Sequence, residues 1–265
     1  MTPFTLTPIG TSPAWYNPGE PSSGFLLEVA GQRILIDCGS GVISRYLAIY
    51  GPEAPIDAIV ISHMHADHCF DLVPLKFGIA YGTLGHWRPQ LWLPPDGRER
   101  LTRLASTWDD DFSCFTESYD VREYRAGTDF GIGGVQVAAL EVPHYIRSHA
   151  LRFEYAMSSF GYSSDLGPSD HLAPFMRGVD LLLAEAGFDE RDNLDVAGRG
   201  HITAREAGEL AQRAGAHSLL LTHVPIEHGV ERVQQSASAA FRRGPVAVAR
   251  SGECYDVSQR LAATG

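Results

Sequence analysis

Four strong metal ligands lie within residues 62–68 of the chain: His63, His65, Asp67 and His68. The segment directly follows an apolar, β-branched stretch that is typical of a buried strand. Two histidines two residues apart on an extended chain point the same way, so His63 and His65 can bind one ion. As the chain turns, Asp67 and His68 can hold a second ion. These ligands favour zinc or another borderline divalent metal, and a polar turn merely rich in histidine is the alternative.

Three further candidate ligands, His144, Asp165 and His223, each stand where an apolar, strand-like stretch ends. A lone histidine or aspartate in such a place is usually ordinary loop chemistry. Together with the first group, however, they indicate one metal centre that is assembled from distant segments. The elements that must position these side chains therefore decide whether the centre can form.

Strand-like and helix-like stretches alternate along both halves of the chain. We expect strands over 4–9, 25–30, 33–37, 56–61, 91–93, 131–142, 151–155, 159–163, 179–183, 218–221, 246–249 and 254–257, and helices over 70–81, 96–108, 203–214 and 236–241. Thr203 and Glu206 form a capping box, and Gly215 ends the helix that begins there. Because strands and helices occur in both halves, we predict two sheets packed face to face and covered by helices.

The composition is that of one globular domain, with 265 residues of which 44% are hydrophobic and 20% charged. We therefore predict a single domain over 1–265. No apolar run is long enough to span a bilayer, and the first ten residues resemble neither a basic leader nor a signal core, so we expect a cytoplasmic protein without a membrane partner. The four cysteines have no paired spacing, which argues against a disulfide framework.

The net charge of −11 limits the choice of partners. Proteins that bind nucleic acid usually neutralise phosphates with clustered lysine and arginine, and this chain has no such cluster and a single lysine, Lys76. A long nucleic acid is therefore a poor candidate partner, whereas a small anion held by metals stays possible.

The order of the ligand-type residues resembles that of the metallo-β-lactamase superfamily. His-x-His-x-Asp-His at 63–68 is followed by His144, Asp165 and His223, and Asp37, at the end of a strand-like stretch, matches that superfamily's early structural aspartate. The match spans residues 37–223 and is much more specific for fold and metal site than for substrate. It implies the α/β (α+β) class and a four-layer αββα sandwich, the metallo-β-lactamase fold.

The resemblance also implies two divalent metal ions, with zinc in first place and manganese or iron as alternatives. His63, His65 and His144 would bind the first ion, Asp67, His68 and His223 the second, and Asp165 would bridge them. Two such ions can share a hydroxide that is nucleophilic at neutral pH, and Asp67 would accept or relay its proton. Asp37 would orient a ligand imidazole through its other nitrogen.

Two more segments, 183–188 and 200–204, resemble paired motifs of the ribonuclease Z-like phosphodiesterase branch of that superfamily. The resemblance assigns Glu185 and His201 to the reaction. Glu185 would orient His201 and favour its charged form, and His201 would contact a phosphoryl oxygen or protonate the leaving oxygen. The alternative is that Glu185 merely ends a strand and His201 merely precedes a helix cap.

The substrate class follows from what the chain lacks and from its nearest resemblance. Members of the branch that cut tRNA precursors carry a long basic arm, and no insertion of that kind is present. Segments 62–72 and 219–225 look like an actinobacterial cyclic-AMP phosphodiesterase group. We therefore hypothesise a zinc phosphodiesterase that acts on a small cyclic nucleotide or cyclic phosphodiester. A lactonase or thioesterase, a ribonuclease Z-like endoribonuclease and a non-catalytic scaffold are the alternatives, and the branch makes a homodimer possible.

The roles of a few polar and aromatic side chains stay open at this stage. Arg147 either holds a substrate phosphate or is a solvated loop residue, and His149 either faces the pocket or packs inside. The aromatic side chains that either rim the pocket or belong to the core are Trp15, Tyr16, Trp87 and Trp108.

Overall fold

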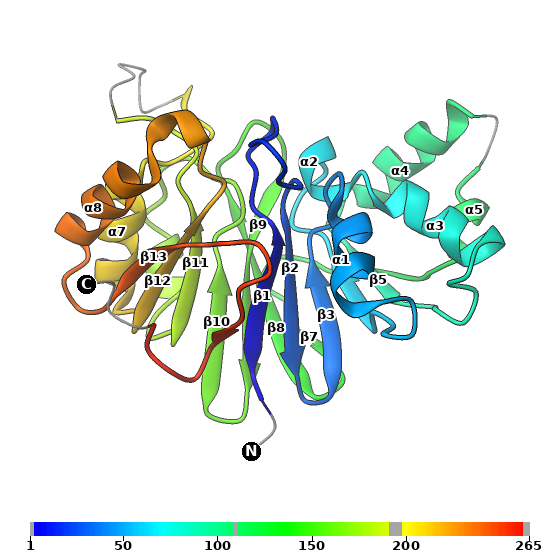
Figure 1. The fold of residues 1–265 in the computed structure, drawn as a ribbon, viewed down its shortest axis with the longest axis horizontal. Helices are drawn as coiled ribbons and strands as arrows, with labels where there is room; N and C mark the ends of the chain where they lie inside the picture. Colours follow the sequence, from blue (N-terminus) through cyan, green and yellow to red (C-terminus); the bar gives the residue numbers. More distant parts are fainter. Residues whose placement is uncertain (1–2, 109–110, 191–197, 262–265) are drawn as a thin grey trace.

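The computed structural model describes residues 3–108, 111–190 and 198–261, and its frame is a pair of β-sheets packed face to face (Figure 1). The first sheet has the spatial order β14 (Tyr255–Asp256), β1 (Thr5–Gly10), β2 (Gly24–Val29), β3 (Gln32–Ile36), β4 (Ala58–Val60), β5 (Gln90–Leu93) and β6 (Asp120–Glu123). The second has the order β13 (Val246–Val248), β12 (Ser218–Thr222), β11 (Leu181–Glu185), β10 (Ser158–Tyr162), β9 (Ser148–Tyr155), β8 (Val135–Val142) and β7 (Phe130–Ile132).

Helices cover the outer faces of both sheets. Beside the first sheet lie α1 (Val42–Tyr50), α2 (Ala66–Cys69), α3 (Leu72–Tyr81), α4 (Gly97–Ser106) and α5 (Ser113–Thr116), and beside the second lie α6 (Leu172–Phe175), α7 (Ala204–Ala214) and α8 (Val230–Ala240). Figure 1 shows α1, α3, α4 and α5 on one flank and α7 and α8 on the other. The predicted αββα sandwich is thus confirmed. Within the described ranges, every helix is too short or too polar to cross a bilayer.

Apolar side chains from the facing sheets form the central core. Phe25 of β2 meets Tyr162 of β10 with ring centroids 5.3 Å apart, and Leu6, Phe153 and Phe160 are fully buried beside them. Burial of apolar surface stabilises the folded state by roughly 25 cal/mol for each Å² removed from water. The two sheets are therefore held together by their inner faces along most of their length.

The strand directions bring the ends of several strands to one edge of the molecule. Strands β3 and β4 run parallel, as do β10, β11 and β12. Strand β8 is antiparallel to β9, which is antiparallel to β10, so β8 points the same way as β10. An isolated bridge between His63 and Ser148 joins the two sheets at this edge. The carboxyl ends of β4, β8, β10, β11 and β12 therefore open into the same region.

The predicted elements agree with the structure except in a few places. The helix expected over 203–214 is α7, which has the full capping box at Thr203 and ends at Gly215 in the left-handed conformation. The helix expected to begin at residue 236 starts at Val230 instead, after Gly229, so that prediction of its start was wrong. Helix α1, strand β6 and the four-residue helices α2, α5 and α6 were missed. Helix α1 has no capping side chain, and β6 is a partly exposed, polar edge strand.

Candidate metal centre

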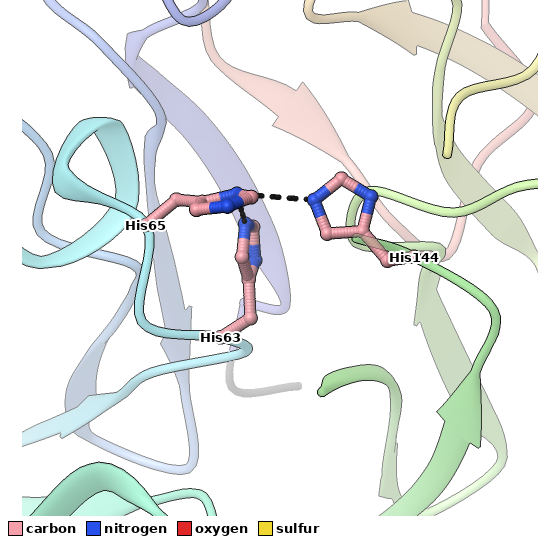
Figure 2. Close-up of side chains that lie close together, drawn as sticks. All are labelled: His63, His65 and His144. Carbon is pink, nitrogen blue, oxygen red and sulfur yellow. Dashed lines mark hydrogen bonds between the residues drawn. The ribbon is translucent and has the colours of Figure 1, made fainter. Parts of the chain in front are cut away.

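Three histidine side chains meet at the shared edge of the two sheets. His63 and His65 come from the loop after β4, and His144 follows β8 on the opposite sheet (Figure 2). The Nδ1 atom of His65 lies 3.1 Å from Nε2 of His63 and 3.1 Å from Nε2 of His144. The three rings thus direct one nitrogen each toward a common point.

The outer nitrogens of two of these rings are held by oxygen atoms. His144 Nδ1 donates to the carbonyl oxygen of Gly200 at 2.7 Å, and Nδ1 of His63 lies 3.1 Å from Oγ of Ser62. A proton on Nδ1 of His144 leaves the lone pair of its Nε2 free to face inward. This is the tautomer that a metal-binding imidazole requires.

A second group lies next to the first and consists of Asp67, His68, Asp165 and His223. The Oδ2 atom of Asp165 is 3.3 Å from Nε2 of His68 and 3.2 Å from Nε2 of His223. The same oxygen is 3.9 Å from Nε2 of His63 in the first group. Asp165 therefore lies between the two groups, at the position expected of a bridging ligand.

Asp37 contacts the second group on the side of His68 that faces away from the other ligands. Its Oδ2 atom lies 2.7 Å from Nδ1 of His68 and accepts hydrogen bonds from Tyr162 Oη and Ser62 Oγ at 2.9 and 2.8 Å. The backbone N–H of Ser62 donates to Oδ1 at 2.7 Å. This fully buried carboxylate fixes the ring of His68 with Nε2 directed at the site.

The backbone is strained or tightly packed at the strand ends that present these side chains. Asp37, Ser164 and His223 have φ values of 58°, 55° and 57°, the left-handed region that residues other than glycine rarely adopt. Gly39 lies against the carbonyl oxygen of Asp67, which a Cβ at that position would approach to 1.9 Å. Such local costs cluster at functional sites, where the surrounding fold maintains them.

Within the second group, the carboxylates and the imidazoles stabilise one another's charged forms. Burial opposes their ionisation, but His223 and His68 hold the pKa of Asp165 well below its ordinary value. In the same way, burial would lower the pKa of His68, but Asp165 and Asp67 raise it. In the first group, burial and the neighbouring His144 lower the pKa of His65 to about 4, so its imidazole is neutral at pH 7. A neutral imidazole is the form that binds a metal.

The donor set fits divalent cations. The candidate ligand atoms within each group lie within 4.8 Å of one another. Nitrogen ligands about 2 Å from a tetrahedral zinc ion are about 3.3 Å apart, close to the 3.1 Å separations among the three histidines. In addition, Nε2 of His68 is buried and faces the carboxylate oxygens of Asp67 and Asp165, each 3.3 Å away, without a well-aligned hydrogen bond to either. A cation that lies among one imidazole nitrogen and two carboxylates would satisfy all three groups.

A glutamate–histidine pair lies beside these groups. Glu185 ends β11, and its two carboxylate oxygens are each 3.1 Å from Nδ1 of His201, which precedes α7. Glu185 is fully buried and also accepts the N–H groups of Leu166 and Gly187. Burial would lower the pKa of His201, but Glu185 raises it to about 9. Nδ1 of His201 lies 4.0 Å from Oδ2 of Asp165, so the pair faces the bridging position.

All the candidate site residues of the sequence analysis therefore meet at one place. Several of the side chains whose roles the sequence left undecided lie elsewhere. His149 is fully buried in β9 against the ring of Tyr124, with Nδ1 3.3 Å from the carbonyl oxygen of Ser62. Trp87 is a core residue packed edge-on against Tyr46.

The other side chains with open roles are exposed or are paired with residues that are not candidate ligands. Trp15 and Tyr16 are exposed on the β1–β2 connection and Trp108 is exposed after α4, whereas Arg147 pairs with Glu141 at 3.5 Å.

The sequence analysis missed Tyr145. Its ring centroid lies 5.2 Å from that of His144 and 5.7 Å from that of His201, and the residue is 61% exposed. Its place directly after His144 was the one available signal. That signal does not tell on which side of His144 the ring lies.

Comparisons with known proteins identify the relatives of the chain. Residues 32–224 match the family described as "Beta-lactamase superfamily domain". The chain is 31% identical over 259 residues to the uncharacterized protein ML1173 of Mycobacterium leprae, which covers 95% of this chain and 88% of that one. It is 30% identical over 256 residues to the probable metallo-hydrolase YhfI of Bacillus subtilis, with 95% and 99% covered. A ribonuclease Z of Methanopyrus kandleri is 26% identical over 280 residues, with 92% and 94% covered.

Solved structures support the same fold. The crystal structure of YhfI from Bacillus subtilis matches with a TM-score of 0.82 at 27% identity and covers 96% of this chain and 99% of that one. The short form of human tRNase Z matches with a TM-score of 0.74 at 20% identity, with 96% and 99% covered. A diphosphatase of the PhnP family matches with a TM-score of 0.70 at 20% identity, with 98% and 100% covered.

Proposed function

The chain belongs to the metallo-β-lactamase superfamily of hydrolases, and from that membership we propose that it is a dinuclear zinc phosphodiesterase acting on a small cyclic nucleotide or another cyclic phosphodiester. The observation that carries the proposal is the Glu185–His201 pair, placed 4.0 Å from the bridging carboxylate of Asp165. A phosphodiester under attack carries negative charge on its non-bridging oxygens as well as on its leaving oxygen, and a histidine that a buried glutamate keeps charged can meet either one. Two of the similar proteins, a ribonuclease Z and a diphosphatase, bear names of enzymes that act on phosphate bonds.

The metal ligands are assigned to two sites. His63, His65 and His144 would hold one ion, Asp67, His68 and His223 would hold the other, and Asp165 would be shared. Bound there, the ions supply Lewis-acid chemistry and make water nucleophilic at neutral pH. The hydrogen bonds from the outer nitrogen of His144 to Gly200 and from that of His68 to Asp37 would orient the inward nitrogens of both rings toward an ion.

The remaining steps are performed by side chains of the chain itself. A water molecule attacks phosphorus, and the carboxylate of Asp67 accepts its proton. The bond from phosphorus to the leaving oxygen breaks, and Nε2 of His201 gives its proton to that oxygen. Glu185 fixes the ring through Nδ1 and stabilises the charged imidazole that carries the proton.

The charge of the chain supports a small substrate. With 32 acidic and 21 basic side chains, the protein lacks the general attraction for a polyanion that proteins binding long RNA rely on. A small phosphodiester can still be held by local contacts, because its charge is met at the metal site and by His201.

A substrate panel tests the proposal directly. The purified, zinc-loaded protein is assayed with bis(p-nitrophenyl) phosphate, adenosine 3′,5′-cyclic phosphate, a lactone series and a tRNA precursor. We expect turnover of the two small phosphodiesters. Turnover of lactones alone contradicts the proposal in favour of an ester hydrolase, and cleavage of only the precursor favours a ribonuclease. Absence of bound metal and of all hydrolysis favours a scaffold.

The variant His201→Ala tests the leaving-group role. We expect kcat for the cyclic nucleotide, whose leaving oxygen is a basic alkoxide, to fall about 100- to 10,000-fold, the range of general acid catalysis. The loss for bis(p-nitrophenyl) phosphate should be much smaller, because p-nitrophenolate departs without a proton. Metal content should be unchanged. Equal losses on both substrates would show that His201 does not protonate the leaving group.

A further inference from the structure

The open side of the site is where His65, His144 and His201 lie. These three side chains are only partly buried, whereas His63, His68, Asp165 and His223 are buried. A substrate must therefore approach past the partly buried histidines. Tyr145 lies on this side, in ring contact with both His144 and His201.

The ring of Tyr145 is seated on a glycine. A Cβ at Gly200 would lie 2.6–2.8 Å from Cε2, Cζ and Cδ2 of Tyr145, so the ring occupies the space that a larger residue at position 200 would fill. The carbonyl of the same glycine accepts the Nδ1 proton of His144. The ring thus packs against Gly200 and two imidazoles, although the residue as a whole is 61% exposed. An exposed but packed aromatic ring is suited to bind another flat group.

Two other exposed aromatic residues, Trp15 and Phe70, follow β1 and α2. The indole N–H of Trp15 donates to Glu227 at 3.1 Å, which ties Trp15 to the loop after β12. Phe70 follows α2, beside the first sheet, and no ring contact joins it to His201 among the described residues. Among these candidates, Tyr145 alone has a ring contact with His201 in the described part of the chain.

From this geometry we propose that Tyr145 is a specificity-determining residue on whose ring the nucleobase of the substrate stacks. The proposal rests on the proposed function, since it assumes that His201 meets the leaving oxygen of a phosphodiester. The portion of the substrate beyond that oxygen lies on the side of His201, and the ring of Tyr145, 5.7 Å from that of His201, is an aromatic surface within its reach. The preferred substrates are therefore phosphodiesters of nucleosides, rather than phosphodiesters without an aromatic group.

Two substrates that differ only in the base test this inference. Adenosine 3′,5′-cyclic phosphate is compared with the base-free sugar cyclic phosphate, and the monoester product is followed by ³¹P NMR. Stacking of a base on an aromatic side chain corresponds to about 5- to 150-fold in affinity when the side chain is removed. We therefore expect the wild-type kcat/KM to favour the nucleotide by roughly tenfold or more.

Substitutions at Tyr145 separate stacking from a structural role. In Tyr145→Ala and Tyr145→Leu the preference should fall to near one, through a loss on the nucleotide alone, while bound metal stays constant. The leucine variant keeps apolar bulk over Gly200 but cannot stack. Tyr145→Phe should keep the preference. The matched control is Tyr81→Ala, which removes a tyrosine that is 85% exposed on α3 and should change neither substrate.

The possible outcomes decide the inference. It is overturned if both variants lose activity equally on the two substrates, if neither loses any, or if the phenylalanine variant loses the preference. It is also overturned if the wild-type protein hydrolyses both phosphodiesters with equal efficiency. Failure of the proposed function has a different signature, because the wild-type protein would then hydrolyse neither phosphodiester.

Discussion

At the scale of single residues, Asp37 holds the ring of His68 in place within the second ligand group. Its carboxylate is fully buried, and its partners are the N–H and hydroxyl of Ser62, the imidazole of His68 and the hydroxyl of Tyr162. A buried carboxylate is tolerated only when its lone pairs are satisfied. Tyr162 belongs to the opposite sheet, so this one carboxylate also couples the two sheets behind the site.

The variant Tyr162→Phe measures that coupling. Removing the hydroxyl deprives the charged carboxylate of one donor, and hydrogen bonds to charged groups contribute about 1.5–3 kcal/mol. We expect a loss of this size in the free energy of unfolding, measured by urea denaturation of the metal-free protein. The matched control is Tyr119→Phe, because the buried hydroxyl of Tyr119 donates to the neutral carbonyl of Leu72. A loss at Tyr162 no larger than that at Tyr119 contradicts the role given to Asp37.

The residues of the site differ in how far the sequence could predict them. The motif residues 63–68 were identifiable from type and spacing, and Asp37, Glu185 and His201 through resemblance to a family. Tyr145 and Tyr162 were not, because their importance arises from contacts with residues that are remote in sequence: Tyr162 meets Asp37 across 125 positions, and Tyr145 is seated on Gly200. A single tyrosine next to a motif carries no periodicity that would reveal such a contact.

At the scale of elements, the site depends on how the loop after β12 is held. His223 has φ of 57°, so the chain turns abruptly there. The β1–β2 connection supports the turn, because Asn17 donates to the carbonyl of Val224 at 2.9 Å and accepts the N–H of Ile226 at 2.9 Å. The amide side chain of Asn17 thus satisfies a backbone carbonyl and a backbone N–H of the strained loop that carries His223.

The variant Asn17→Ala should loosen this loop. Two hydrogen bonds of this kind contribute roughly 1–3 kcal/mol together, and part of that loss should appear as weaker metal binding through His223. Zinc titration calorimetry should show reduced affinity in one of two binding steps, with the other unchanged. Trp15→Phe is the control on the same connection, because it removes only the exposed contact with Glu227. Unchanged affinity in both steps would refute the proposed support by Asn17.

The elements were predicted best where a local signal marks their ends. Helix α7 has a capping box at its start and a left-handed glycine at its end, and both were visible in the sequence. Helix α8 begins after Gly229 without a capping side chain, and the predicted start at residue 236 was six residues late. Strand β6 is short, polar and at an edge of its sheet, so its residues lack the alternation by which strands are recognised.

At the scale of the whole molecule, the candidate metal centre lies at the junction between the two sheets. His63, His65, Asp67 and His68 follow β4 in the first sheet, and His144, Asp165 and His223 follow β8, β10 and β12 in the second. Packing of two sheets could be predicted from the sequence pattern. Which side chains meet across the junction could not, since pairs such as Asp67 and His223 are 156 positions apart.

This arrangement predicts that metal stabilises the entire fold rather than one loop. A ligand that binds only the folded state at 100 times its Kd adds about 2.7 kcal/mol of stability, which in a chain of this size raises Tm by roughly 5–10 °C. We therefore expect zinc to raise Tm by at least this amount and a chelator to reverse the change, as measured by differential scanning calorimetry. The transition should stay single, because ions bound by both sheets couple their unfolding.

Two matched variants show whether the stabilisation depends on both halves. His65→Ala removes a ligand of the first sheet, and His144→Ala removes its partner, 3.1 Å away, from the second. Both side chains are half-buried, so neither truncation should lower Tm of the metal-free protein by much. Because one ion needs ligands from both sheets, each variant should lose a similar part of the zinc-dependent rise. If only one variant lost it, the ion would be bound by one half alone, and the metal would not join the sheets.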